Sequence, residues 1–130
     1  MSTNLEFWPA ELTSDLPESP ILIMQKAAAE LGVATQGAVE AIVQLDSNTT
    51  ENEGLIAYDF YINAKALNYR HLLFWVQVNP ILLYPVQIHV HGVEYEVSTS
   101  EQLTYWVKSV TTSTETVRMI KALLVQSRSL

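Results

Sequence analysis

The chain has 130 residues, 48% of them hydrophobic and 16% charged, and it contains no cysteine, which excludes disulfides, thiolate catalysis, iron–sulfur clusters and cysteine zinc sites. A chain of this length typically forms one domain, and its low charge content favours a surface that is partly apolar. The net charge of −7 is concentrated in residues 1–60, which hold ten acidic residues and one basic residue. No cluster of Lys or Arg occurs, so we expect neither nucleic acid nor a membrane as a partner.

Residues 1–18 are predicted to form an irregular N-terminal arm. They contain Pro9, Pro17 and four acidic residues, and they show neither a helical nor a strand period. Phe7 and Trp8 could dock this arm onto the body of the protein, and a loose tail is the alternative. Residues 19–130 are expected to form a single α+β domain.

A helix is predicted to follow the arm. Ser19 is a good N-cap residue, and Pro20 suits the first helical position. Three consecutive alanines at 27–29 favour a helix. Gly32 is expected to end the helix in a left-handed conformation.

The middle of the chain alternates between apolar and polar residues, which is typical of half-buried strands. The predicted strands cover residues 38–46, 55–64, 68–78, 82–90 and 93–97, with a polar loop at 47–54. Pro85 has no amide hydrogen, so the fourth strand should be an edge strand or contain a bulge there. Helices are expected to cover the apolar sheet face formed by Tyr58, Phe60, Phe74, Val76, Tyr84 and Val86.

Two helices are predicted at the C-terminal end. Ser98 with Glu101, and Thr112 with Glu115, have the spacing of a capping box. A run of strands followed by helices indicates an α+β fold. We therefore expect an N-terminal helix, an antiparallel meander of four to five strands, and two C-terminal helices packed on one sheet face.

The three histidines are the candidate metal ligands. If the hairpin between the third and fourth strands turns near Pro80, His71 faces His89, and His91 lies two residues further along on the same face. Three imidazoles within reach of one another could bind Zn²⁺ or another transition metal. The alternative is that they are ordinary, half-exposed strand histidines.

A second candidate site is the sheet face opposite the helices. Tyr69, Leu73, Trp75, Leu83 and Pro85 are predicted to form an apolar surface that a protein partner or a second copy covers. Ordinary core packing and cross-strand pairing would also account for these residues.

The sequence contains no motif that carries catalysis: there is no Gly-rich phosphate loop and no nucleophile elbow. We therefore expect a non-enzymatic protein-interaction module without a cofactor, which self-associates or binds a protein partner through its apolar sheet face. The alternatives are a protein that binds a small molecule or metal through the histidine-containing face, and an enzyme with a scattered site. The acidic N-terminus lacks the apolar core of a signal peptide, so a cytoplasmic location is expected.

Overall fold

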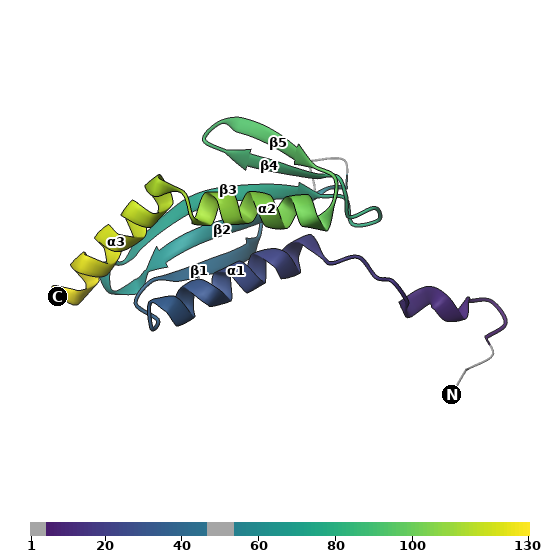
Figure 1. Ribbon diagram of the computed structural model, residues 1–130, viewed down its shortest axis with the longest axis horizontal. Coiled ribbons are helices and arrows are strands. Elements are labelled where there is room, and N and C mark those ends of the chain that lie inside the picture. The colour runs from purple at the N-terminus through teal and green to yellow at the C-terminus, as the bar shows by residue number, and fades with distance from the viewer. Residues whose placement is uncertain (1–4, 47–53) are drawn as a thin grey trace.

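Every strand lies beside its neighbours in the sequence, in one antiparallel sheet. The computed structural model describes residues 5–46 and 54–130, and the strand order is β1-β2-β3-β4-β5. The strands are β1 (Glu40–Leu45), β2 (Ile56–Ala64), β3 (Tyr69–Val78), β4 (Val86–Val90) and β5 (Val93–Val97). The predicted α+β fold with an antiparallel meander is therefore confirmed (Figure 1). Apart from Gly54, the loop predicted at 47–54 lies outside the described residues.

The sheet is accompanied by the helices α1 (Pro20–Ala34), α2 (Ser100–Thr111) and α3 (Thr114–Arg128), and by the short 3₁₀ turns η1 (Ala10–Thr13) and η3 (Lys65–Leu67). Helices α1 and α2 contact each other and lie across one face of the sheet (Figure 1). Helix α3 contacts η3, at the end of the sheet. Both C-terminal helices therefore lie near the same face, as expected.

Helix α1 begins where the sequence predicts and ends later. Pro20 occupies its first turn, and the helix continues through Gly32 to Ala34. The left-handed positions come afterwards, at Gln36 and Gly37, with φ angles of 55° and 83°. The prediction that Gly32 ends the helix is therefore wrong, because a single glycine inside a helix costs only about 1 kcal/mol.

Both C-terminal helices begin one residue later than predicted. The side chain of Thr99, rather than that of Ser98, accepts a hydrogen bond from the Gln102 amide at 3.1 Å. At the start of α3, the side chain of Ser113 accepts a hydrogen bond from the backbone amide of Thr116 at 3.2 Å. Each start lies in a run of Ser and Thr residues, any of which can act as an N-cap. Sequence alone therefore could not fix which of them does.

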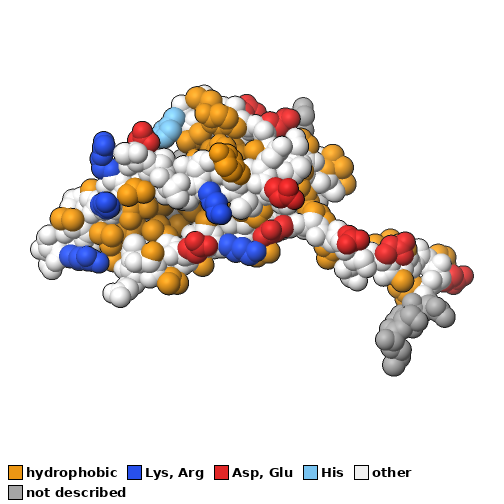
Figure 2. Space-filling view, viewed as in Figure 1, with side chains coloured by type: hydrophobic (Ala, Val, Ile, Leu, Met, Phe, Trp, Pro, Cys, Tyr) orange, Lys and Arg blue, Asp and Glu red, His pale blue; other side chains and the backbone are white. Residues whose placement is uncertain are grey.

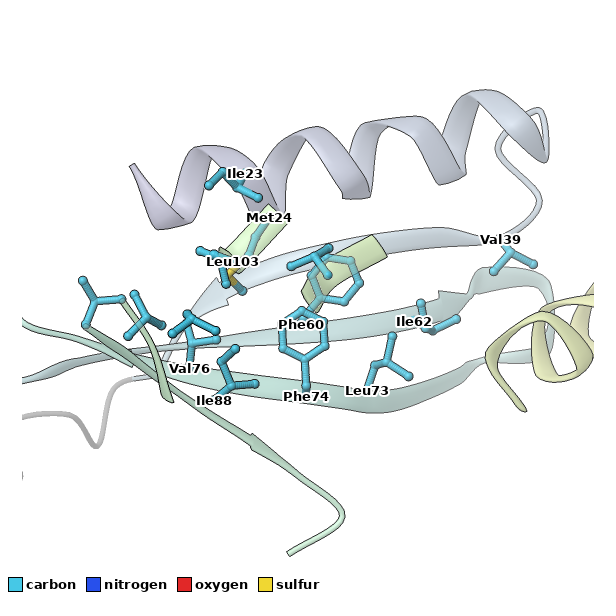
Figure 3. Close-up of a cluster of buried hydrophobic side chains, with 14 of the residues drawn as sticks. Ile23, Met24, Val39, Phe60, Ile62, Leu73, Phe74, Val76, Ile88 and Leu103 are labelled. Atoms are coloured by element: carbon cyan, nitrogen blue, oxygen red, sulfur yellow. The ribbon is translucent and has the colours of Figure 1, made fainter. Parts of the chain in front are cut away.

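The hydrophobic core lies between the sheet and the helices α1 and α2. Phe60 and Phe74 stack with their ring centroids 4.8 Å apart, and the edge of Trp106 contacts Phe74 at 4.9 Å. Met24 of α1 and Leu103 of α2 are completely buried and point at the sheet (Figure 3). The helix-covered face thus contains the predicted residues Phe60, Phe74, Val76 and Val86, all buried.

Strand β3 contains a bulge that changes which of its side chains point to each face of the sheet. Phe60 of β2 pairs with Phe74, but the next residue, Tyr61, pairs with Leu72. Leu73 is the extra residue, and its side chain is buried in the core together with that of Phe74. The predicted alternation, which placed Leu73 beside Trp75 on the other face, is therefore wrong at this point.

The connection between β3 and β4 is longer than predicted. Strand β4 begins at Val86. Residues 79–85 form a turn in which the Asn79 side chain accepts hydrogen bonds from the backbone amides of Ile81 and Leu82. Pro85 precedes the strand and follows a cis peptide bond. The strand predicted from residue 82 is thus wrong over its first four residues, and Pro85 needs no bulge to be accommodated.

Candidate interaction surfaces

A groove with a volume of about 460 Å³ lies between α1 and the α2–α3 pair, beside the contact between α1 and α2. Its floor is the sheet, represented by Phe60, Ile62 and Leu73. Its walls come from all three helices: Ile23, Ala27, Leu31 and Ala34 of α1, Thr104, Val107, Lys108 and Thr111 of α2, and Thr116 and Ile120 of α3. Figure 2 shows the corresponding hollow, with hydrophobic side chains at its bottom. We call this feature the helix groove.

Small side chains keep the helix groove open. Ala27 and Ala34 line its α1 wall, and Thr104 and Thr111 line the opposite wall on α2. Packed helices normally fill the space between their axes with larger side chains that interdigitate. The floor itself is nearly covered, because Phe60, Ile62 and Leu73 are only 1%, 2% and 6% exposed. The accessible apolar surface of the groove therefore belongs to its walls, where Leu31 and Ile120 are half-buried and Ala34 is exposed. The sequence did not predict this groove; the available signal was the pair of alanines Ala27 and Ala34, which lie seven residues apart on one face of α1.

Charged side chains stand at the rim of the helix groove. Lys26 Nζ lies 2.7 Å from Glu18 Oε1, and 62% and 37% of these two side chains are exposed. Glu30 and Lys108 also line the rim. An exposed pair of this kind contributes only about 0–1 kcal/mol, so these charges can exchange partners when a ligand arrives.

The opposite sheet face carries an aromatic pair flanked by a polar contact. The rings of Trp75 and His89 stack with centroids 3.8 Å apart and planes 9° from parallel. His89 Nε2 lies 2.8 Å from Gln77 Oε1. Trp75 therefore already has a partner within the chain, which makes it a poorer anchor for a second protein.

Further along the same face, polar contacts link β1, β2 and β3. The Arg70 guanidinium lies 4.6 Å from the ring centroid of Tyr61, and it donates to Gln44 Oε1 at 3.3 Å. The Tyr61 hydroxyl lies 3.5 Å from Asp59 Oδ2. Burial, together with the charge of Asp46, raises the pKa of Asp59 above its ordinary value. This face is thus largely a network of polar pairs.

The five predicted interface residues do not share one surface. Leu73 lies in the core and Leu83 packs against it. Pro85 is exposed in the turn before β4, and Tyr69 is 44% exposed at the start of β3. Only Trp75 lies where expected, on the face turned away from the core residues Val76 and Ile88. Because the bulge and the long turn separate these residues, the predicted apolar face does not form.

The predicted register of the histidines is wrong. His89 pairs with Trp75, whereas His71 pairs with the core residue Ile62, so the two histidines lie on opposite sheet faces. His91 lies in the two-residue turn between β4 and β5, with a φ angle of 51°. All three line one hollow of about 390 Å³ where β3 and β4 diverge. Across residues 5–46 and 54–130, however, no three His, Cys, Asp or Glu side chains are grouped so that they could hold a metal ion.

The N-terminal arm does not dock onto the body. Residues 5–16, which we call the arm, run away from the sheet and helices (Figure 1). Phe7 and Trp8 are 82% and 65% exposed. Three more large hydrophobic side chains of the arm are more than half exposed: Leu5, Leu12 and Leu16. The arm is therefore an apolar segment that nothing in its own chain covers, among the residues described.

Comparison with known proteins gave no match to a family model, a curated protein or a solved structure. In the described part of the chain, no helix has the length and apolar character needed to cross a bilayer. Functional inference consequently depends on the surfaces themselves.

Proposed function

We propose that the chain is a non-enzymatic protein-interaction module that binds an apolar, acidic protein segment in the helix groove. The observation that carries this proposal is the accessible apolar groove of about 460 Å³. Its volume falls within the ~300–1,000 Å³ typical of clefts that bury drug-sized, largely apolar ligands. Grooves between helices are common receptors for short protein segments. The absence of cysteine fits a cytoplasmic setting for such a module.

The helix groove supports this role better than the sheet face expected from the sequence. Two of the expected anchors, Leu73 and Leu83, pack in or against the core. The anchor that remains on that face, Trp75, stacks on His89. Binding a partner there would require breaking polar contacts, whereas the groove offers apolar surface that is already formed.

Charge favours an acidic segment as the ligand. Residues 100–130 contain four basic residues against two acidic ones, but of these only Lys108 lines the helix groove, where it favours an acidic group on the ligand. The basic residues are Lys108, Arg118, Lys121 and Arg128, and the acidic ones are Glu101 and Glu115. In Figure 2, both basic and acidic side chains border the hydrophobic hollow. Complementary charge accelerates association and selects among partners.

The test is a binding titration with a peptide unrelated to this chain. Fluorescence anisotropy of a short labelled peptide made of Leu, Phe and Glu is measured against the dilute full-length protein. Ala27→Glu places a carboxylate on the half-buried α1 wall of the helix groove. We expect it to weaken binding about tenfold or more, equivalent to ~1.4 kcal/mol.

The matched control is Ala29→Glu, which places the same side chain at an exposed position of the same helix that does not line the groove. It should leave the peptide affinity unchanged. Circular dichroism must show that both variants remain folded, and Lys108→Glu repeats the test from the opposite wall at an exposed position. No binding to the wild-type protein, or equal losses in Ala27→Glu and Ala29→Glu, would refute the proposal.

A further inference from the structure

The arm exposes the kind of surface that a folded chain normally covers. Its five large hydrophobic side chains are each more than half exposed. Phe7 and Trp8 are adjacent, and a buried aromatic side chain removes about 150–250 Å² from water. The arm also forms the 3₁₀ turn η1, so part of its backbone is already folded. These properties suit a segment that binds elsewhere.

The arm is directed away from the helix groove of its own chain. The Tyr84 hydroxyl donates to the backbone oxygen of Glu18 at 2.8 Å, and Lys26 holds the Glu18 side chain. The Tyr84 hydrogen bond holds Glu18, which lies between the arm and α1 and lines one part of the groove. To enter its own groove, the arm would have to reverse direction between Leu16 and Glu18. A second copy is free of that constraint.

The arm and the helix groove both present apolar surface, and Lys108 gives the groove one charge opposite to that of the arm. The arm carries Glu6, Glu11 and Asp15 and no basic residue, whereas the α2–α3 wall of the groove is lined by one charged residue, Lys108. Figure 2 shows acidic and hydrophobic side chains along the arm, and both basic and acidic side chains around the hollow. The same chain therefore contains both an apolar acidic segment and a groove suited to one.

We infer that the arm of one copy occupies the helix groove of a second copy. Phe7 and Trp8 supply the apolar anchors, and an acidic residue of the arm faces Lys108 on the α2 wall. Reciprocal exchange of two arms closes a twofold dimer, the commonest symmetry of soluble oligomers. This inference rests on the proposed function, because it names the occupant of the same groove.

Cysteine cross-linking between full-length copies tests the inference, and the chain has no native cysteine to interfere. Isotopically labelled Ala10→Cys protein, with the cysteine in the arm, is mixed with unlabelled Thr111→Cys protein, with the cysteine in the groove. A short bis-maleimide links the cysteines, and mass spectrometry identifies labelled–unlabelled pairs. The control is Ser109→Cys, an exposed position on the same helix that does not line the groove.

We expect a several-fold higher yield of cross-links between copies at position 111 than at position 109. The combined change Phe7→Ser and Trp8→Ser in the arm should remove that difference. Equal yields at both positions would overturn the inference. A second measurement uses one chain that carries both Ala10→Cys and Thr111→Cys. If its cross-links form only within single chains, the inference is also overturned. If the unrelated peptide still binds the groove in that case, the proposed function stands and only the inferred occupant is wrong.

Discussion

Asp59 has the most clearly perturbed carboxylate on the open sheet face. Burial is the main cause of its raised pKa, and the negative charge of Asp46 adds to it, while the Tyr61 hydroxyl opposes the shift. The folded state therefore holds the Asp59 proton more tightly than the unfolded state does. Ionisation of this group costs stability: the cost is absent below the ordinary pKa of 3.8 and is complete once the pH exceeds the folded pKa.

We predict that Asp59→Asn raises the free energy of unfolding at pH 7, because the amide carries no charge to desolvate. The gain should shrink as the pH falls and disappear below 3.8, where the wild-type carboxyl is protonated in both states. Urea denaturation over a pH series measures this. Glu96→Gln, which removes an exposed carboxylate from the same face, is the control and should have little effect. A loss of stability in Asp59→Asn at pH 7 would contradict the account.

At the scale of single elements, the bulge in β3 decides what the sheet presents on each side. Without it, Leu73 would join Trp75 on the open face and Leu72 would enter the core. With it, Leu73 is only 6% exposed and forms part of the floor of the helix groove, whereas Leu72 is 41% exposed. The bulge thus converts a predicted interface residue into groove lining.

Two neighbouring substitutions test the bulge. Leu73→Ala should lower the free energy of unfolding by about 2–5 kcal/mol, as is usual for a truncated core leucine. Leu72→Ala should cost much less, about 0.5 kcal/mol, because its side chain is largely exposed. Chemical denaturation of both variants measures the difference. The reverse order of stability would mean that β3 alternates without a bulge.

The sequence pattern locates these elements correctly where apolar and polar residues alternate. It does not fix the exact positions of bulges and helix starts where neighbouring residues are of the same type. Alternating apolar and polar residues located all five strands. Leu72, Leu73 and Phe74 are all apolar, however, so the pattern could not reveal which of them is the extra residue. The same ambiguity among Ser98, Thr99 and Ser100 shifted the start of α2 by one residue.

At the scale of the whole molecule, the predicted fold is confirmed, but the candidate site depended on distances that no pattern encodes. The histidine register relied on a tight turn near Pro80, whereas the connection extends to Pro85 and pairs Trp75 with His89. The helix groove arises from the way in which α1 and the α2–α3 pair are placed on the sheet. That placement is set by tertiary packing, so the sequence alone could only indicate that α1 has small side chains.

The whole molecule combines an apolar arm with an apolar groove that its own arm does not fill. Such a chain should self-associate only when both the apolar arm and the helix groove are intact. Removing the apolar side chains of the arm, or charging the groove, should therefore have the same effect on assembly.

Sedimentation velocity across a concentration series tests this claim most directly. We predict that the wild-type protein shifts from 14.6 kDa to twice that mass as its concentration rises. The Phe7→Ser/Trp8→Ser variant and Ala27→Glu should remain monomeric throughout, while Ala29→Glu should behave as wild type. A wild-type protein that stays monomeric at every concentration, or a dimer that survives both the arm and the groove changes, would contradict the account.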